Sequence, residues 1–170
     1  MDLNAALRHI PDFPKAGIDF IDITTVLKDK DLFRETIDQM AELVRDVEYD
    51  LIIGSESRGF ILGAPLAYAT GTGFAPVRKK GKLPYRTVSA TYSLEYGSDT
   101  LEMHIDAVQA GQKVLVVDDL LATGGTALAN CQMVEALGGE VAKVLFFIEL
   151  TELGGREKLS RYPIESLVKI

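Results

Sequence analysis

The segment from Val114 to Thr126, VLVVDDLLATGGT, constrains the fold of this chain more than any other part of the sequence. Its opening apolar run is typical of a strand buried on both faces. The small-residue loop Ala122–Thr126 comes next and leads into a helix-compatible stretch. Open α/β sheets bind ligands at the carboxyl ends of their strands, where such a loop lies. Backbone N–H groups, threonine hydroxyls and the helix N-terminus can together bind one phosphate group there.

Two adjacent acids, Asp118 and Asp119, stand between this strand and its loop. Because carboxylates repel a phosphate, we assign them another task, which is to accept hydrogen bonds from neighbouring hydroxyls such as a ribose 2′ and 3′ pair. The alternative is that one acid caps the loop and the other is solvated. The order of strand, acids and loop favours the diol interpretation. No Gly-Lys-Ser/Thr follows, so the loop is not a Walker A loop.

Strand and helix patterns alternate through most of the 170 residues, a length that favours one domain. This alternation predicts an α/β fold with a mainly parallel sheet. Asp31 is the expected cap of a helix whose apolar face includes Ile37 and Met40. The pattern predicts strands at 51–53, 74–78, 114–117 and 141–148, hairpin arms at 87–96 and 100–105, and helices at 2–9, 31–44, 58–69 and 125–137.

Composition excludes several classes of partner and site. The net charge of −7 argues against nucleic acid or an anionic membrane surface, since both require a basic face. No apolar run approaches the roughly 20 residues of a transmembrane helix, and the first residues lack a signal-peptide core. Cys131 is the single cysteine, which fits a reducing, cytoplasmic location. No metal-ligand spacing links it to His9 or His104, so we expect no protein metal site.

The segment Val114–Thr126 resembles the signature with which type I phosphoribosyltransferases bind 5-phosphoribosyl-1-pyrophosphate (PRPP). Further segments are similar, in the right order, to the members of that family that use adenine. They are PDFPKAGIDFIDIT, SESRGF, RKKGKLP, SLEYG and ELTELGGREKL. The resemblance covers nearly all of residues 1–170 and implies one domain of that fold, with a mainly parallel central sheet flanked by helices. It also implies a small N-terminal hood for base recognition at 1–28 and a flexible hairpin arm at 78–105.

The resemblance also implies roles for the residues around PRPP. Asp118 and Asp119 are expected to hold the ribose, and Arg58 to take part in catalysis. The Glu56-Ser57 pair matches a dipeptide joined by a cis bond in the family. The 5′-phosphate is assigned to Ala122, Thr123, Gly124, Gly125 and Thr126, and the pyrophosphate to Glu56, Ser57, Arg58, Arg78, Lys79 and Lys82. The alternatives are a helix-capping turn with a surface arginine at 56–59 and, for any single lysine, a solvated loop.

At the base, the resemblance places Glu95 on the N7/N9 side of adenine, where a carboxylate can accept a proton or hold the reactive tautomer. The alternative is an exposed strand glutamate. Phe20 is expected to stack on adenine, while the backbone of Asp19 and its neighbours reads the N1 and N6 edge. Ile21 stands where many members carry Arg, and Asp19 replaces a usual apolar residue.

The implied reaction transfers the 5-phosphoribosyl group of PRPP to N9 of adenine, giving AMP and pyrophosphate in purine salvage. Mg²⁺ is the expected cofactor, held mainly by PRPP or pyrophosphate. A homodimer is implied, in which part of the basic cluster reaches the neighbouring site. Two alternatives stay open: transfer to another purine base, or a non-catalytic PRPP sensor, which would need a nucleic-acid-binding surface.

Overall fold

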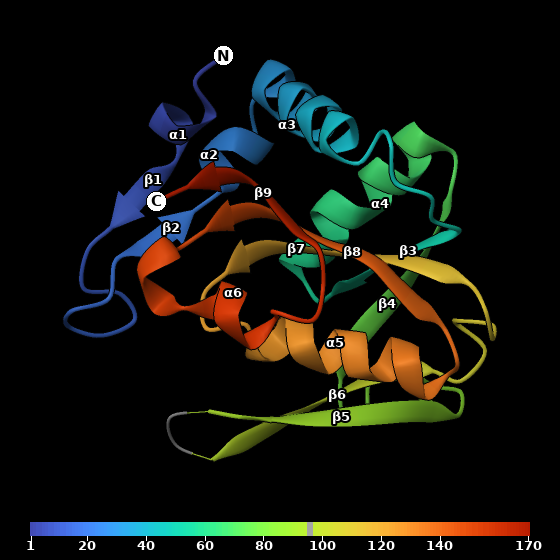
Figure 1. The fold of residues 1–170 in the computed structure, drawn as a ribbon. Helices are drawn as coiled ribbons and strands as arrows, with labels where there is room; N and C mark the ends of the chain where they lie inside the picture. Colours follow the sequence, from blue (N-terminus) through green and yellow to red (C-terminus); the bar gives the residue numbers. More distant parts are fainter. Residues whose placement is uncertain (95–96) are drawn as a thin grey trace.

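The computed structural model describes residues 1–94 and 97–170, and within these ranges one seven-stranded sheet forms the centre of the molecule (Figure 1). The expected catalytic Glu95 lies outside the described residues. In spatial order the strands are β5 (Thr87–Ser93), β6 (Ser98–His104), β4 (Gly73–Lys79), β3 (Leu51–Ser55), β7 (Lys113–Leu121), β8 (Glu140–Glu149) and β9 (Ile164–Lys169). The five strands from β4 to β9 are parallel, and β5 and β6 form an antiparallel hairpin on β4. The predicted α/β fold with a mainly parallel sheet is therefore confirmed.

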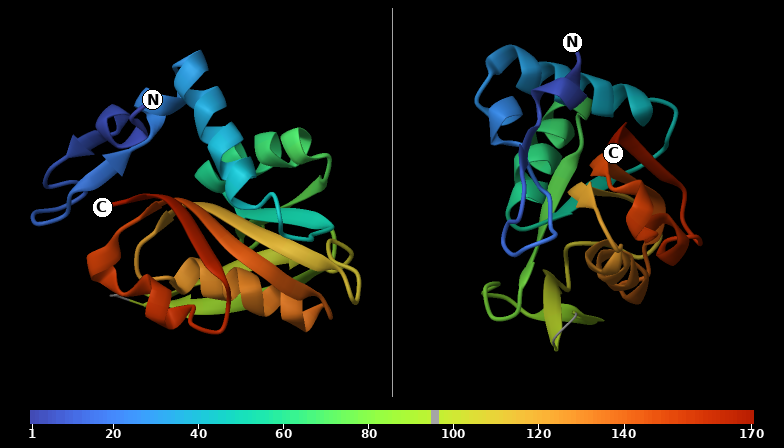
Figure 2. Two further views of the ribbon diagram at one scale, coloured as in Figure 1. Left: turned by 45° about the horizontal axis from the view of Figure 1, so that its top comes forward. Right: turned by 90° about the vertical axis from the view of Figure 1, so that its left-hand side faces the viewer.

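Helices cover both faces of this sheet, as the two views of Figure 2 show. The helices α3 (Lys30–Leu43) and α4 (Arg58–Thr70) pack on one face, and α5 (Gly125–Ala136) and the short α6 (Gly155–Lys158) on the other. Strand β7 contributes side chains to the core on both faces of the sheet, with Leu115 and Val117 in one hydrophobic cluster and Val114 and Val116 in the other. Because side chains alternate along a strand, a strand covered on both faces needs an unbroken apolar run.

The N-terminal segment differs from its prediction. Instead of one helix over 2–9, it forms the single turn α1 (Leu3–Ala6) and then β1 (Arg8–Ile10), which pairs antiparallel with β2 (Phe20–Asp22). Asp2 caps only that one turn, because its carboxylate accepts the N–H of Ala5 and the backbone becomes extended at Leu7. A helix this short has little stability of its own, so pairing with a partner strand decides the conformation.

The start of α3 is also corrected, because Asp29, not Asp31, caps it. One Asp29 oxygen accepts the N–H groups of Asp31 (2.9 Å) and Leu32 (3.0 Å). Asp31 lies in the first turn instead, where a negative charge favours the helix dipole. The apolar face is as predicted, with Ile37 and Met40 buried.

Three further elements complete the chain: α2 (Thr24–Leu27), the 3₁₀ turn η1 (Thr151–Leu153) and the edge strand β9. None of them was predicted from the periodicity. Within the described residues, no helix combines the length and the apolarity needed to cross a membrane.

Candidate active site

The loop Ala122–Thr126, here called the phosphate loop, follows the carboxyl end of β7 and opens α5. Gly124 precedes the helix with φ of +90°, a conformation that glycine adopts without steric cost. The loop lines a cavity of about 210 Å³ together with residues of β5, Leu94 and Asp118. The predicted arrangement of a helix N-terminus and a glycine turn facing one concavity is therefore present, and it suits an anion.

The phosphate loop rests on the backbone of Gly155, a residue for which the sequence alone predicts no role. A Cβ on Gly155 would lie 2.5 Å from the carbonyl oxygen of Ala122 and 2.6 Å from a methyl carbon of Leu121. In return, a Cβ on Gly124 would lie 3.0 Å from the Gly155 carbonyl oxygen. The segment ELTELGGREKL contains this glycine, but the 33-residue separation from Ala122 hides the contact in the sequence.

Helix α6 carries Gly155 and is fastened to the sheet by a buried acid. Arg156 donates from Nε and Nη2 to the two oxygens of Glu149, at 2.9 and 2.8 Å, in a bidentate pair. Ser166 Oγ donates to the same carboxylate. Hydrogen bonding from Arg156, with that from Ser166, outweighs burial and lowers the pKa of Glu149 to about 2. The support beneath the phosphate loop is thus an ionised pair between the end of β8 and α6.

Tyr92 of β5 forms another wall of the same cavity and was also missed. A Cβ on Gly125 would meet the Tyr92 ring at 3.4 Å, so the ring packs directly on the start of α5. The Tyr92 hydroxyl lies 3.4 Å from Asp99. The hairpin arm therefore contributes an aromatic surface beside the phosphate loop.

The two predicted diol ligands lie in a neighbouring cavity of about 340 Å³, which is also lined by residues 55–58, Leu120 and Thr126. Asp118 is buried and accepts the N–H of Asp119 at 2.9 Å. Burial, and then the charge of Asp119, raises the pKa of the Asp118 carboxyl well above its ordinary value. Gly59 permits this crowding, because a Cβ there would lie 3.1 Å from the Asp118 carboxylate.

Arg58 joins this acid pair to the predicted base-stacking residue. Its Nε donates to Asp119 at 2.5 Å, and its guanidinium carbon lies 5.6 Å from the centroid of the Phe20 ring. Phe20 also makes an edge contact with Phe13, at 5.2 Å between ring centroids. A flat ligand on Phe20 would therefore lie next to the ribose acids, within range of a cation–π partner.

The other two predicted base-binding residues point their side chains elsewhere. Ile21 is 7% exposed and belongs to the core beneath β2, which explains why an apolar residue is stable there. The Asp19 carboxylate lies 2.6 Å from His9 Nδ1 across the N-terminal hairpin, and half of the side chain is exposed. Neither residue lines the cavity of the phosphate loop or that of the acid pair.

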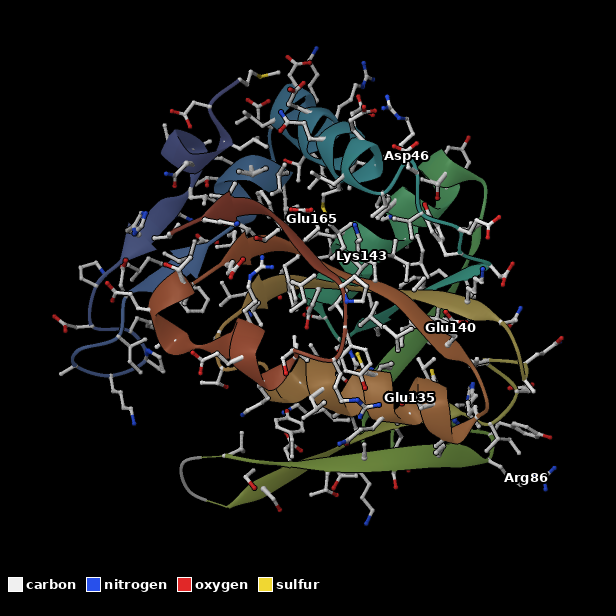
Figure 3. All side chains as sticks on the ribbon, viewed as in Figure 1. Asp46, Arg86, Glu135, Glu140, Lys143 and Glu165 are labelled. Carbon is white, nitrogen blue, oxygen red and sulfur yellow. The ribbon has the colours of Figure 1, made fainter. Side chains whose placement is uncertain are left out.

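Three of the predicted pyrophosphate residues contact the carboxylate of a fourth, Glu56. Glu56, joined to Ser57 by a cis peptide bond as the resemblance implies, accepts the backbone N–H of Lys79 at 2.7 Å and Lys82 Nζ at 2.5 Å. Arg78 Nε lies 3.5 Å from the same side chain, and Lys79 Nζ pairs instead with Asp99. Every cation of this predicted set thus has an acidic neighbour. Arg86 is a nearby basic residue outside this set, and it lies at the opposite end of β5 from the phosphate loop (Figure 3).

A larger cavity of about 760 Å³ lies away from these groups, between the end of α3 and the start of β7. Its cations are occupied by surface acids, since Arg45 pairs with Glu42 and Lys113 pairs with Glu48. We therefore place the candidate active site at the carboxyl ends of β3 and β7.

Comparisons with known proteins identify the family to which this chain is similar. The family described as phosphoribosyl transferase domain matches residues 22–168. The adenine phosphoribosyltransferase of Acetivibrio thermocellus is 62% identical over 170 residues, which is 99% of each chain. Among solved structures, adenine phosphoribosyltransferase from Thermoanaerobacter pseudethanolicus has a TM-score of 0.98 at 54% identity and covers 99% of this chain and 98% of that one. The Saccharomyces cerevisiae enzyme, in complex with an imino-altritol bisphosphate and adenine, has a TM-score of 0.92 at 44% identity, covering 98% and 96%.

Proposed function

This chain belongs to the phosphoribosyl transferase domain family, and we propose that it transfers the 5-phosphoribosyl group of PRPP to N9 of adenine, giving AMP and pyrophosphate for purine salvage. The activity is that of a pentosyltransferase. The observation that carries the proposal is the contiguity of the phosphate loop, the acid pair Asp118 and Asp119, and the Arg58–Phe20 contact at one edge of the sheet. These three features match the phosphate, the ribose and the base of one nucleotide in order.

We assign the 5′-phosphate to the phosphate loop and the ribose 2′ and 3′ hydroxyls to the acid pair. The loop offers backbone donors and a helix N-terminus, which need no side-chain movement to meet a phosphate. Asp119 must divide its acceptor capacity between Arg58 and a ribose hydroxyl, which a carboxylate with about four lone-pair sites can do. Arg58 would keep its remaining guanidinium donors for the pyrophosphate that borders the ribose.

The chemical step replaces pyrophosphate by a base nitrogen at the anomeric carbon, which passes through an oxocarbenium-like state. Glu95, outside the described residues, is our proposed acceptor for the N9 proton, and the stacked base would be held on Phe20. Arg58, with the basic residues at 78–82, would stabilise the charge that grows on the leaving pyrophosphate.

Mg²⁺ is part of this proposal. The 340 Å³ cavity is lined by carboxylate and hydroxyl oxygens, the ligands that Mg²⁺ prefers. Within the described residues no group of three His, Cys, Asp or Glu side chains forms a metal cluster, so the substrate's oxygens and water would supply most ligands. The bound ion would neutralise charge on the pyrophosphate.

We also propose that the chain acts as a homodimer in a reducing, cytoplasmic compartment. The first part comes from the family resemblance, and the second from the lone Cys131. Light scattering on the purified protein tests the oligomeric state, because a monomer of 18.6 kDa and its dimer differ twofold in mass.

The function is tested with a base panel. Purified protein is mixed with PRPP, Mg²⁺ and, in turn, adenine, hypoxanthine, guanine and xanthine, and nucleotide and pyrophosphate are measured. We expect AMP from adenine and no product from the oxopurines. Turnover of an oxopurine alone would overturn the assignment of the base, and PRPP binding without any turnover would indicate a sensor.

A further inference from the structure

Glu56 occupies an unusual position, because it belongs to the cavity of the acid pair and yet points its carboxylate at the basic segment, residues Arg78–Lys82. One side-chain oxygen receives the Lys79 backbone N–H at 2.7 Å, and the other receives Lys82 Nζ. Arg78 Nε approaches to 3.5 Å. The Glu56 backbone N–H is itself bonded to the carbonyl of Val77 in β4, at 2.9 Å. Both ends of this residue thus fasten the end of β4 and the turn after it.

The Glu56 side chain is 13% exposed, so its charge is partly removed from water. Burial acts to raise the pKa of this carboxyl, but the hydrogen bonds from Lys82 and the Lys79 backbone, with the charges of Lys82 and Arg78, lower it below its ordinary value. Glu56 is therefore ionised at neutral pH, and the surrounding cations stabilise that charge.

A second acid, Glu102, holds the same turn in a different way. Its carboxylate accepts the Gly81 backbone N–H at 2.6 Å and the Thr87 hydroxyl at 2.7 Å. Both hydrogen-bond donors are neutral, and a neutral amide side chain can replace a carboxylate as their acceptor. Of these two acids, Glu56 is the one whose carboxylate is hydrogen-bonded to a cation, Lys82.

We propose that Glu56, which lines the PRPP cavity, is a positioning residue for pyrophosphate and holds Lys82, Arg78 and the Lys79 backbone in place for this ligand. The proposal rests on the proposed function, since it names the residue that prepares one subsite of that reaction. A free lysine side chain loses much rotamer freedom when it binds an anion, and a partner that orders it beforehand reduces this loss. Lys82 keeps two ammonium donors for pyrophosphate while the third stays on Glu56.

The charge of Glu56 could also weaken pyrophosphate binding, because a carboxylate repels a nearby anion. If repulsion dominated, removing the charge of Glu56 would strengthen pyrophosphate binding, whereas loss of positioning weakens it. The direction of the change therefore decides between the two.

The experiment is calorimetric titration of the full-length protein with magnesium pyrophosphate and, separately, with AMP. For Glu56→Gln we expect pyrophosphate affinity to fall about 10-fold and AMP affinity to stay within twofold, because AMP does not use the basic segment. In Glu56→Asp the charge remains but the reach is shorter, so we expect a smaller loss, about threefold. Glu102→Gln is the matched control, with pyrophosphate affinity within twofold of the wild type.

A double-mutant cycle with Lys82→Met tests the route of the effect. Because Glu56 is proposed to act mainly through Lys82, Glu56→Gln should change pyrophosphate affinity less than threefold when Lys82 is already Met. Fully additive losses, tighter or unchanged pyrophosphate binding in Glu56→Gln, or an equal loss of AMP affinity would each overturn the proposal. The base panel measures the turnover of each base by the wild type in a separate experiment. If adenine proved to be the wrong base, the pyrophosphate titration would still test the role of Glu56.

Discussion

The phosphate loop and the basic segment are proposed to bind the two phosphate-bearing ends of one substrate, yet the chain builds them differently. The phosphate loop extends from β7, a strand buried on both faces, and rests on the backbone of Gly155. The basic segment consists of partly exposed cations held by the carboxylates of Glu56 and Asp99, and Glu102 accepts the Gly81 backbone N–H of the same turn. Close packing orders the first region, and ionic hydrogen bonds order the second. Damage to the first should therefore change folding and binding together, and damage to the second should change binding alone.

The largest loss of ligand affinity is expected at the acid pair Asp118 and Asp119, which carries the buried charge of the packed region. In the double variant Asp118→Asn with Asp119→Asn, PRPP and AMP affinities should fall at least about 100-fold, because two charged acceptors for ribose hydroxyls are lost. Titration calorimetry measures both affinities, and pyrophosphate affinity is expected to change far less.

The same variant is not expected to lose stability, although it loses ligand affinity. A buried carboxyl whose pKa is raised in the folded state contributes less stability as the pH rises through that pKa. At pH 7 the neutral pair should therefore raise Tm or leave it unchanged. Asp46→Asn, at a side chain that is 91% exposed, is the control for both measurements. An unchanged PRPP affinity in the double variant would refute the ribose assignment.

The next effect tests packing under the phosphate loop. Gly155→Ala forces a methyl group to within 2.5 Å of the Ala122 carbonyl, so the loop must shift. We expect AMP affinity to fall about 30-fold and the free energy of unfolding to fall by about 1–3 kcal/mol, the usual cost of overpacking. Calorimetry and urea unfolding measure the two quantities.

Gly73→Ala is the matched control, since a Cβ there meets a Leu51 methyl at an ordinary 3.6 Å. It should keep both AMP affinity and stability. A Gly155→Ala protein with wild-type AMP affinity would show that the phosphate loop does not depend on α6.

Acid should weaken the support of α6 selectively. The folded-state pKa of Glu149 is about 2, below the ordinary value of 4.5, so its pairing stabilises the fold above about pH 4.5 and is lost as the pH falls toward 2. We expect this contribution to be about 2 kcal/mol, since Arg156 is partly exposed and solvent screens the pair. Urea unfolding between pH 3 and 7 should show a shallower pH dependence in Glu149→Gln. Parallel curves for the two proteins would exclude Glu149 as the source.

The smallest effect is expected at the boundary between the two regions. Tyr92→Phe keeps the ring that packs on Gly125 and removes only a hydroxyl at 3.4 Å from Asp99. Steady-state kinetics with adenine should give kcat/KM within about threefold of the wild type. A loss beyond 10-fold would mean that the hydroxyl couples the arm to the phosphate loop, and the two regions would then not be separable.

Much of the packed region could be predicted from the sequence. The strand, the acid pair, the loop and the helix of residues 114–137 are consecutive, so period and composition sufficed to place them. The family resemblance was confirmed, and so were the positions along the chain of the strands from β3 to β8. The residues assigned to substrate remain predictions, and Glu95 among them lies outside the described part of the chain.

The wrong predictions share one cause. Periodicity extended a helix through residues 2–9, but Arg8 and its neighbours pair with β2, ten to fourteen residues away. Asp31 was chosen as a helix cap, but the cap is Asp29, because several acids lie near the start of α3 and only backbone geometry selects one. Local sequence preference was weak in both places. Pairing with β2 decided the conformation of the first segment, and the backbone geometry at Asp29 decided which acid caps α3.

The sequence by itself thus determined the α/β class, the phosphate loop and the family, since each depends on residues that are neighbours along the chain or on a resemblance that follows chain order. Only the tertiary structure decided that Arg58 reaches Asp119, that Gly155 supports Ala122 and that Glu56 holds Lys82. These contacts join residues 26 to 61 positions apart. The energy of such contacts depends on the distance between atoms in the folded protein. The number of residues between two positions in the sequence does not determine that distance.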